Sequence, residues 1–200
     1  MAALKAIRVA VWAAVVVLGA AVAWVAIPHG GANPIGGGLT TASIGGPLTL
    51  TDQTGATVTE ASLQGHPSAL FFGYTFCPDV CPTTLSDVTT WLGKLGTGGD
   101  KLKVYFITVD PERDTRQQMA SYLTAFDPRI VGLTGPRPAI DQIIKDYRVY
   151  AHKVGTGPDY TMDHTASIYL LDDKAQFVGT IDYQEKDAEV MAKLARLVGA

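Results

Sequence analysis

The chain has 200 residues, a formal net charge of −3 and 47% hydrophobic residues, which suffices for one domain with a substantial core and some accessory sequence. No basic stripe appears after the first few residues, so the charge pattern argues against a nucleic-acid-binding protein. The only two cysteines, Cys77 and Cys81, lie close together in the chain. They could form a structural disulfide, a redox pair or part of a metal site.

The N-terminus contains an uncharged run of residues, 9–27, that is rich in Ala and Val. At about 1.5 Å per residue, this run is just long enough to cross a hydrocarbon core about 30 Å thick. Lys5 and Arg8 precede the run and the next basic residue is Lys94, so the positive-inside rule leaves the N-terminus in the cytoplasm. We therefore predict a membrane anchor over residues 1–27.

This topology places the rest of the chain outside the cytoplasm. It predicts a single-pass protein of the cell inner membrane with a periplasmic domain or, in a eukaryote, a domain in the mitochondrial intermembrane space. A cleaved signal peptide is the alternative, because Ala21–Ala23 resembles a small-residue cleavage site. A Gly-rich, uncharged stretch, residues 28–46, follows and is typical of a flexible linker. The folded domain is then expected at 47–200.

Strand and helix patterns alternate through this domain. In chain order we predict strands at 48–52 and 56–59, a buried strand at 68–74, a helix from about 82 to 95, a buried strand at 102–109, a helix at 115–126, a strand at 130–133, a helix at 138–147, strands at 148–154, 165–171 and 176–181, and a terminal helix at 186–198. A polar loop fills 155–163. This order indicates an α/β sandwich with a central mixed sheet flanked by helices.

The spacing of the two cysteines favours chemistry over a structural role. A disulfide between Cys77 and Cys81 would close a very short loop and stabilise the fold little. At the start of a helix the backbone N–H groups and the helix dipole favour negative charge, so we predict lowered pKa values for both thiols. The pair could form a disulfide or bind one soft ion such as Cu(I), whereas structural zinc and iron–sulfur clusters generally need four protein ligands.

A third metal ligand would have to come from elsewhere in the chain. His164 is the best candidate, because it follows the polar loop and precedes a strand that reads as buried. A lone histidine is ordinarily interpreted as a hydrogen-bonded loop residue, and we retain this interpretation for His66 and His152. Met162 carries a soft sulfur close to His164 but is more simply explained by packing.

Three motifs in the domain resemble those of one family. The segment Cys77–Pro82 (CPDVCP) follows a strand and resembles the CxxxCP signature of the Sco/SenC family. The segment Val109–Thr115 (VDPERDT) resembles that family's VDPxRDT loop, and Asp163–Thr165 (DHT) resembles its DH[ST] element. The resemblance covers about residues 47–200 and implies a thioredoxin-like fold, and the predicted N-terminal anchor agrees with it.

The resemblance also implies a function and a ligand set. A Sco/SenC protein is expected to be a copper metallochaperone that helps to assemble the dinuclear copper centre in subunit II of cytochrome c oxidase. Cys77, Cys81 and His164 match the family's copper ligands, and such a set suits both Cu(I) and Cu(II). The expected partners are subunit II, a thioredoxin-like reductant that keeps the cysteines reduced, other copper chaperones and the membrane.

Other residues near these motifs have simpler explanations. Asp79 is either a solvated turn residue or lies near the metal, and Phe76 is expected to shield the site. Asp114 and Thr115 are sufficiently explained as helix-capping residues. A supporting or partner-docking role for the loop 110–115 follows from the resemblance alone.

A thiol–disulfide oxidoreductase is the alternative function, with Cys77 and Cys81 as its redox pair. The usual motif of such enzymes, CxxC, is one residue shorter, and His164 would have no clear role in one. A metallochaperone is not a turnover enzyme, so the sequence leaves the question of enzymatic activity open. A peroxiredoxin-like peroxidase would need a different local cysteine motif and is disfavoured.

Overall fold

The structure, a computed structural model, describes residues 44–199. The predicted anchor at 1–27 and the predicted linker up to residue 43 lie outside these residues. Among the helices of residues 44–199, none has both the length and the apolar character needed to cross a bilayer.

The described residues form strands and helices in nearly the predicted order. The strands are β1 (Thr49–Asp52), β2 (Thr57–Thr59), β3 (Ser68–Gly73), β4 (Lys103–Thr108), β5 (Ile130–Thr134), β6 (Ala151–Val154), β7 (Thr161–His164), β8 (Ile168–Leu171) and β9 (Phe177–Ile181). The helices are α2 (Val80–Lys94), α3 (Arg116–Leu123), α4 (Arg137–Asp146) and α5 (Asp187–Val198), with 3-10 turns η1 (Glu60–Leu63) and η2 (Gly96–Gly98). The predicted strands and helices are present with shifted ends, and β7 lies largely where a polar loop was expected.

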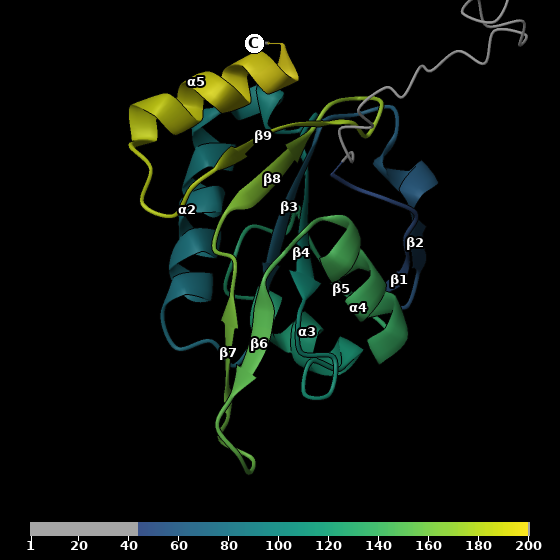
Figure 1. Ribbon diagram of the computed structural model, residues 1–200. Helices are drawn as coiled ribbons and strands as arrows, with labels where there is room; N and C mark the ends of the chain where they lie inside the picture. The colour runs from purple at the N-terminus through teal and green to yellow at the C-terminus, as the bar shows by residue number, and fades with distance from the viewer. Residues whose placement is uncertain (1–43, 200) are drawn as a thin grey trace, which may run out of the picture. The chain divides into compact units, whose positions relative to one another are not determined.

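Seven strands form one mixed sheet in the order β2-β1-β5-β4-β3-β8-β9, and β6 and β7 form a separate antiparallel ribbon (Figure 1). The central strands β3, β4 and β5 run parallel, and β8 pairs antiparallel with β3. Every residue of β3 and all but the first residue of β4 are buried. Continuous apolar sequences of this kind are typical of strands covered on both faces, so the predicted mixed sheet flanked by helices is confirmed.

Helices cover both faces of this sheet. On one face, Leu92 of α2 and Leu194 of α5 pack around Ala69 of β3. On the opposite face, the ring of Tyr147, directly after α4, packs against the ring of Phe72, with centroids 5.6 Å apart. Because side chains alternate along a strand, Ala69 and Phe72 point to opposite faces. The core therefore occupies both sides of β3, and the strand is held rigidly up to its carboxyl end.

Gly73 is the last residue of β3, and α2 approaches the strand at this point. A Cβ atom on Gly73 would lie 2.7 Å from Sγ of Cys81 and 2.7 Å from Cε2 of Phe106, closer than van der Waals contact allows. Cys81, in the first turn of α2, therefore packs directly on the backbone of the strand. The absence of a side chain at residue 73 fixes where this sulfur lies.

We expect Gly73→Ala to lower the free energy of unfolding by about 1–3 kcal/mol, because the added methyl group overpacks against Cys81 and Phe106. Gly93→Ala is the matched control, since Gly93 lies in α2 with nothing within 4 Å of an added Cβ. That control should gain about 0.5–1 kcal/mol of stability through helix propensity. Urea denaturation of the metal-free domain measures both changes. A Gly73→Ala domain as stable as the wild type would contradict the close contact with Cys81.

Candidate metal centre

Two segments that are distant in the sequence meet at the carboxyl end of β3. Cys77 lies in the loop after β3, Cys81 in the first turn of α2, and His164 is the last residue of β7. The two sulfurs and a ring nitrogen of His164 lie within 4.8 Å of one another, the only such group of metal-ligating side chains among residues 44–199. With bond lengths like those of zinc, about 2.3 Å to sulfur, two ligand atoms of one ion lie at most about 4.6 Å apart. The group is therefore close to the spacing that one metal ion requires.

The hydrogen bonds of His164 orient its ring towards the sulfurs. Nδ1 lies 2.9 Å from the carbonyl oxygen of Thr165, and this bond requires the proton to be on Nδ1. Nε2 is the ring nitrogen that faces the sulfurs, and it lies 3.4 Å from Sγ of Cys81. Metal-binding histidines commonly have this arrangement, in which the second ring nitrogen donates to a backbone carbonyl.

Two aromatic side chains hold the imidazole ring in place. The ring of Tyr74 meets it edge-on, with centroids 5.8 Å apart and planes at 89°. The ring of Phe71 lies 6.3 Å away, at 64°. Both residues are fully or almost fully buried, at 0% exposure for Phe71 and 2% for Tyr74. The segment that leads to the cysteines therefore also positions the third candidate ligand.

The two thiols differ in burial and in proton affinity. The Cys81 side chain and His164, acting as hydrogen-bond partners, hold the pKa of Cys77 well below its usual range, against the opposing effect of burial. Cys81 is 0% exposed, and the Cys77 sulfur together with burial raises its pKa. The expectation that both pKa values are lowered is therefore wrong for Cys81. The helix start favours one negative charge at the pair, and the buried thiol keeps its proton.

Asp114 was predicted to be a helix-capping residue, and this is wrong. Its buried carboxylate accepts hydrogen bonds from the backbone N–H and the hydroxyl of Thr75, with the shortest at 2.7 Å, and from the hydroxyl of Thr108 at 2.6 Å. Burial raises the pKa of Asp114, while these hydrogen bonds lower it. Thr115 caps α3 as predicted, accepting from the N–H of Gln118 at 3.1 Å. Asp114 therefore ties the loop that leads to Cys77 to the end of β4.

The remaining residues singled out in the sequence lie around this group or away from it. His164 was predicted to lie directly before the strand at 165–171. In the structure it is the last residue of β7, where it pairs with Ala151 of β6, and β8 begins only at Ile168. Met162 is buried in the core, as the packing interpretation requires, and His66 contacts the hydroxyl of Ser68 at 3.3 Å. Phe76 is 49% exposed, and the shielding of the site by its ring stays a prediction.

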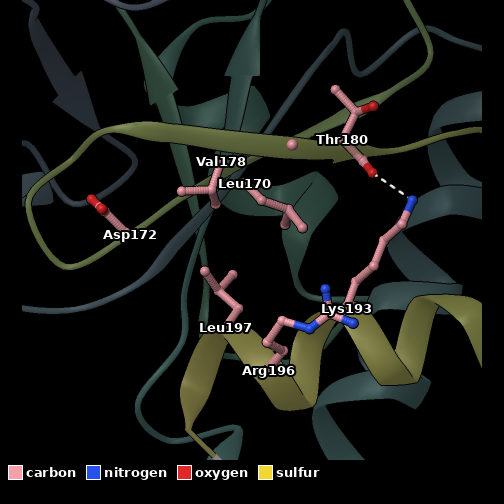
Figure 2. Close-up of a pocket in the computed structure, with 8 residues that line it drawn as sticks. Leu170, Asp172, Val178, Thr180, Lys193, Arg196 and Leu197 are labelled. Atoms are coloured by element: carbon pink, nitrogen blue, oxygen red, sulfur yellow. Dashed lines mark hydrogen bonds between the residues drawn. The ribbon is translucent and has the colours of Figure 1, made fainter.

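A hollow of about 550 Å³ lies between β9 and α5. Its walls combine apolar side chains such as Val178 and Leu197 with Lys193 and Arg196 (Figure 2). Nζ of Lys193 already donates to the carbonyl of Thr180 at 2.8 Å. None of the three candidate ligands lines this hollow, so it is separate from the candidate metal centre.

Comparison with known proteins identifies relatives of the whole domain. A family model described as SCO1/SenC matches residues 37–199. The chain is 36% identical over 159 residues to "Protein SCO1 homolog, mitochondrial" of Homo sapiens, covering 76% of this chain and 52% of that protein. It is 37% identical over 181 residues to "Protein SenC" of Rhodobacter capsulatus, covering 88% and 80%. The chain spans about half the length of the first curated relatives that it matches.

Solved structures with the same fold include copper-bound ones. ScoI of Bradyrhizobium japonicum with copper bound is 50% identical in sequence, with a TM-score of 0.73 over 78% of this chain and 99% of that chain. Yeast Sco1 with copper bound is 37% identical, with a TM-score of 0.73 over 79% and 90%. The described domain has the fold of these structures, which confirms the predicted thioredoxin-like arrangement.

The unequal pKa values of the two thiols predict selective alkylation of the reduced, metal-free domain. We expect iodoacetamide to modify Cys77 at a nearly constant rate from about pH 5 to about pH 8, because its pKa lies below that window. An ordinary thiol, with a pKa of about 8.5, would react about tenfold faster with each pH unit over this range. Cys81 should react only after unfolding. Mass spectrometry with peptide fragmentation measures the rate at each residue.

The control for this experiment is Cys77→Ser, in which the rapid reaction should disappear and Cys81 should stay unmodified in the folded domain. A rate at Cys77 that rises tenfold with each pH unit, or rapid modification of Cys81, would contradict the unequal pair.

Proposed function

Because the chain belongs to the SCO1/SenC family, we propose that it is a copper metallochaperone that binds copper through Cys77, Cys81 and His164. The observation that carries the proposal is the group itself, whose three ligand atoms lie within 4.8 Å of one another. Relatives of the same fold bind copper, as the copper-bound ScoI and Sco1 structures illustrate.

The chemistry of the three side chains suits copper in both oxidation states. Thiolates favour Cu(I), and an imidazole nitrogen is also a good ligand for Cu(II). Cys77 already favours the thiolate form, whereas the buried Cys81 must release its proton when the metal enters. Cys77 is only partly buried, so a thiol of a client protein can approach the ion and replace one ligand at a time. A closed four-ligand site would resist such a transfer.

We further propose that the protein works at a membrane, held by an anchor at 1–27 with the domain outside the cytoplasm. Its client is the dinuclear copper centre in subunit II of cytochrome c oxidase, and a thioredoxin-like reductant keeps Cys77 and Cys81 reduced. The support is the family membership, the uncharged run at 9–27 and the basic residues before it.

A second candidate function is the reduction of client disulfides, and the unequal thiols favour it. The Cys77 thiolate would attack a client disulfide and release one client thiolate. Cys81, after losing its proton, would attack the resulting mixed disulfide, releasing the second client thiolate and leaving a Cys77–Cys81 disulfide. The external reductant then restores both thiols. This route uses no metal and gives His164 no role as a ligand.

Removing the imidazole separates these two functions. We expect His164→Ala to weaken copper binding by about 100-fold or more, since the loss of a ligand exceeds the 10–100-fold effect of losing a group that supports a ligand. His152→Ala is the matched control, because His152 is an exposed histidine on the neighbouring strand β6 and should bind copper as the wild type does. Competition titrations against a chromophoric Cu(I) chelator measure the affinities.

Cys77→Ala and Cys81→Ala should each weaken copper binding as well. A wild-type domain that binds no copper, or binds it equally well after His164→Ala, would refute the three-ligand site. Insulin reduction at thioredoxin-like rates that persists after His164→Ala would favour the oxidoreductase.

The proposed membrane anchor at 1–27 can be tested separately. The full-length chain with a C-terminal tag should stay with the membrane fraction after alkaline carbonate washing, and protease added outside the cytoplasmic membrane should digest its domain. Deletion of residues 1–27 should leave the tag in the cytoplasm. A mature chain that is shortened near Ala23 and released by carbonate would show a cleaved signal peptide.

A further inference from the structure

The ribbon that carries His164 is separate from the main sheet. β6 and β7 pair with each other, while β3 and the cysteine-bearing segment belong to the seven-stranded sheet (Figure 1). No ladder of backbone hydrogen bonds between described strands joins the two sheets. The position of His164 relative to Cys77 and Cys81 therefore depends on the short link from β7 to β8, which pairs with β3, and on side-chain contacts between the ribbon and the rest of the domain.

Arg113, in the loop between β4 and α3, makes several of these contacts. Its Nε donates to Oδ2 of Asp110 at 2.6 Å, and Nη1 donates to the carbonyl oxygen of Tyr160 at 3.0 Å. The hydroxyl of Tyr160 in turn donates to Oδ1 of Asp110 at 2.6 Å. These bonds form a closed ring of three residues, in which Tyr160 takes part through both its backbone carbonyl and its hydroxyl, and Asp110 is 0% exposed. Tyr160 directly precedes β7, so the ring anchors the strand that ends in His164.

The guanidinium group of Arg113 also contacts the other side of the metal centre. Its Cζ lies 3.6 Å from the ring centroid of Tyr160 and 4.7 Å from that of Phe76, the residue before Cys77. It lies 5.7 Å from the ring centroid of Tyr74, which itself packs on His164. One planar cation thus contacts both the segment that leads to Cys77 and the segment that leads to His164.

We propose that Arg113 is a positioning residue that holds the β6–β7 ribbon, and with it His164, over the two cysteines. This inference rests on the proposed function, in which all three side chains bind copper. A guanidinium group suits the task because its planar fork can donate to Asp110 and to the Tyr160 carbonyl while its faces stack on rings. The ammonium group of a lysine is a compact charge and cannot make these contacts together.

The alternative is that Arg113 only neutralises the buried carboxylate of Asp110. Arg113→Gln removes both the charge and the fork, whereas Arg113→Lys keeps the charge next to Asp110. Lys153 provides a matched control, because its Nζ lies 3.7 Å from the Tyr160 centroid while its ion pair is with the exposed Glu112, at 3.6 Å. Lys153→Gln removes a cation from the same ring and leaves the contacts of Arg113 intact.

The test is a double-mutant cycle on copper affinity. Arg113→Gln should weaken binding about tenfold when His164 is present, the effect typical of a residue that supports a ligand. On the His164→Ala background the same substitution should have almost no effect, because the ligand that Arg113 positions is gone. Arg113→Lys should lose affinity like Arg113→Gln, and Lys153→Gln should bind as the wild type does.

A second readout needs no copper. In the metal-free domain, Arg113→Gln should speed backbone hydrogen exchange in β6 and β7 by about tenfold or more and leave exchange in β3 unchanged. Hydrogen exchange therefore tests the positioning role of Arg113 separately from the proposed three-ligand copper site. If His164→Ala binds copper normally, the three-ligand site is wrong, but faster exchange confined to the ribbon would still support the positioning role.

Three outcomes would overturn the positioning role. The first is that Arg113→Gln lowers copper affinity equally with and without His164. The second is that Arg113→Lys binds copper with wild-type affinity. The third is that Arg113→Gln speeds backbone hydrogen exchange uniformly across the domain. If Arg113→Gln does not fold, Tyr160→Leu replaces it. That change removes the ring on which Arg113 stacks and the hydroxyl that donates to Asp110, and it leaves the pair of Arg113 with Asp110 and the bond to the carbonyl of residue 160. Tyr160→Leu should show the same dependence on His164, and an effect independent of His164 would again refute the role.

Discussion

Cys81 packs directly on the backbone of Gly73, with no side chain between helix α2 and the end of strand β3. This contact places one sulfur of the metal centre in the core, at 0% exposure, and sets where α2 begins relative to the sheet. Cys77 then lies one turn earlier, and the N–H of Cys81 donates to its sulfur at 3.3 Å. A buried strand, covered on both faces, is thus the rigid base on which the two sulfurs are mounted.

The same contact contributes to the different behaviour of two chemically identical side chains. The hydrogen bond with the Cys77 sulfur and burial both disfavour a charged sulfur at Cys81, while hydrogen-bond partners at Cys77 favour one. The pair therefore holds one proton on its inner sulfur and presents one thiolate outward. A metal ion that binds both sulfurs must displace the inner proton, so protons compete with the metal and affinity falls as the pH falls.

The sequence predicted the parts of this domain whose signals are local. The apolar runs at 68–74 and 102–109 identified the buried central strands, and Thr115 was correctly identified as a cap. Strand β7 (TMDH) was missed because it is short and polar, with Met162 as its one strongly apolar residue. In such a strand the pairing partner β6, rather than composition, decides the structure.

Other features depend on tertiary contacts that sequence spacing does not contain. Asp114 has the residue type and position of a capping residue, yet Thr75 and Thr108 draw its carboxylate into the core. The raised pKa of Cys81 depends on the neighbouring Cys77 sulfur and on burial, and CxxxC spacing does not fix that burial. The family motifs indicated that His164 belongs with the cysteines. The aromatic residues that contact its ring, Phe71 in β3 and Tyr74 directly after it, belong to an apolar run that the sequence identifies only as core. The contacts that pack the core also set the geometry of the site, because the strand that fills the domain interior aligns the imidazole with the sulfurs. A metal ion that binds there therefore encounters ligands that are already ordered.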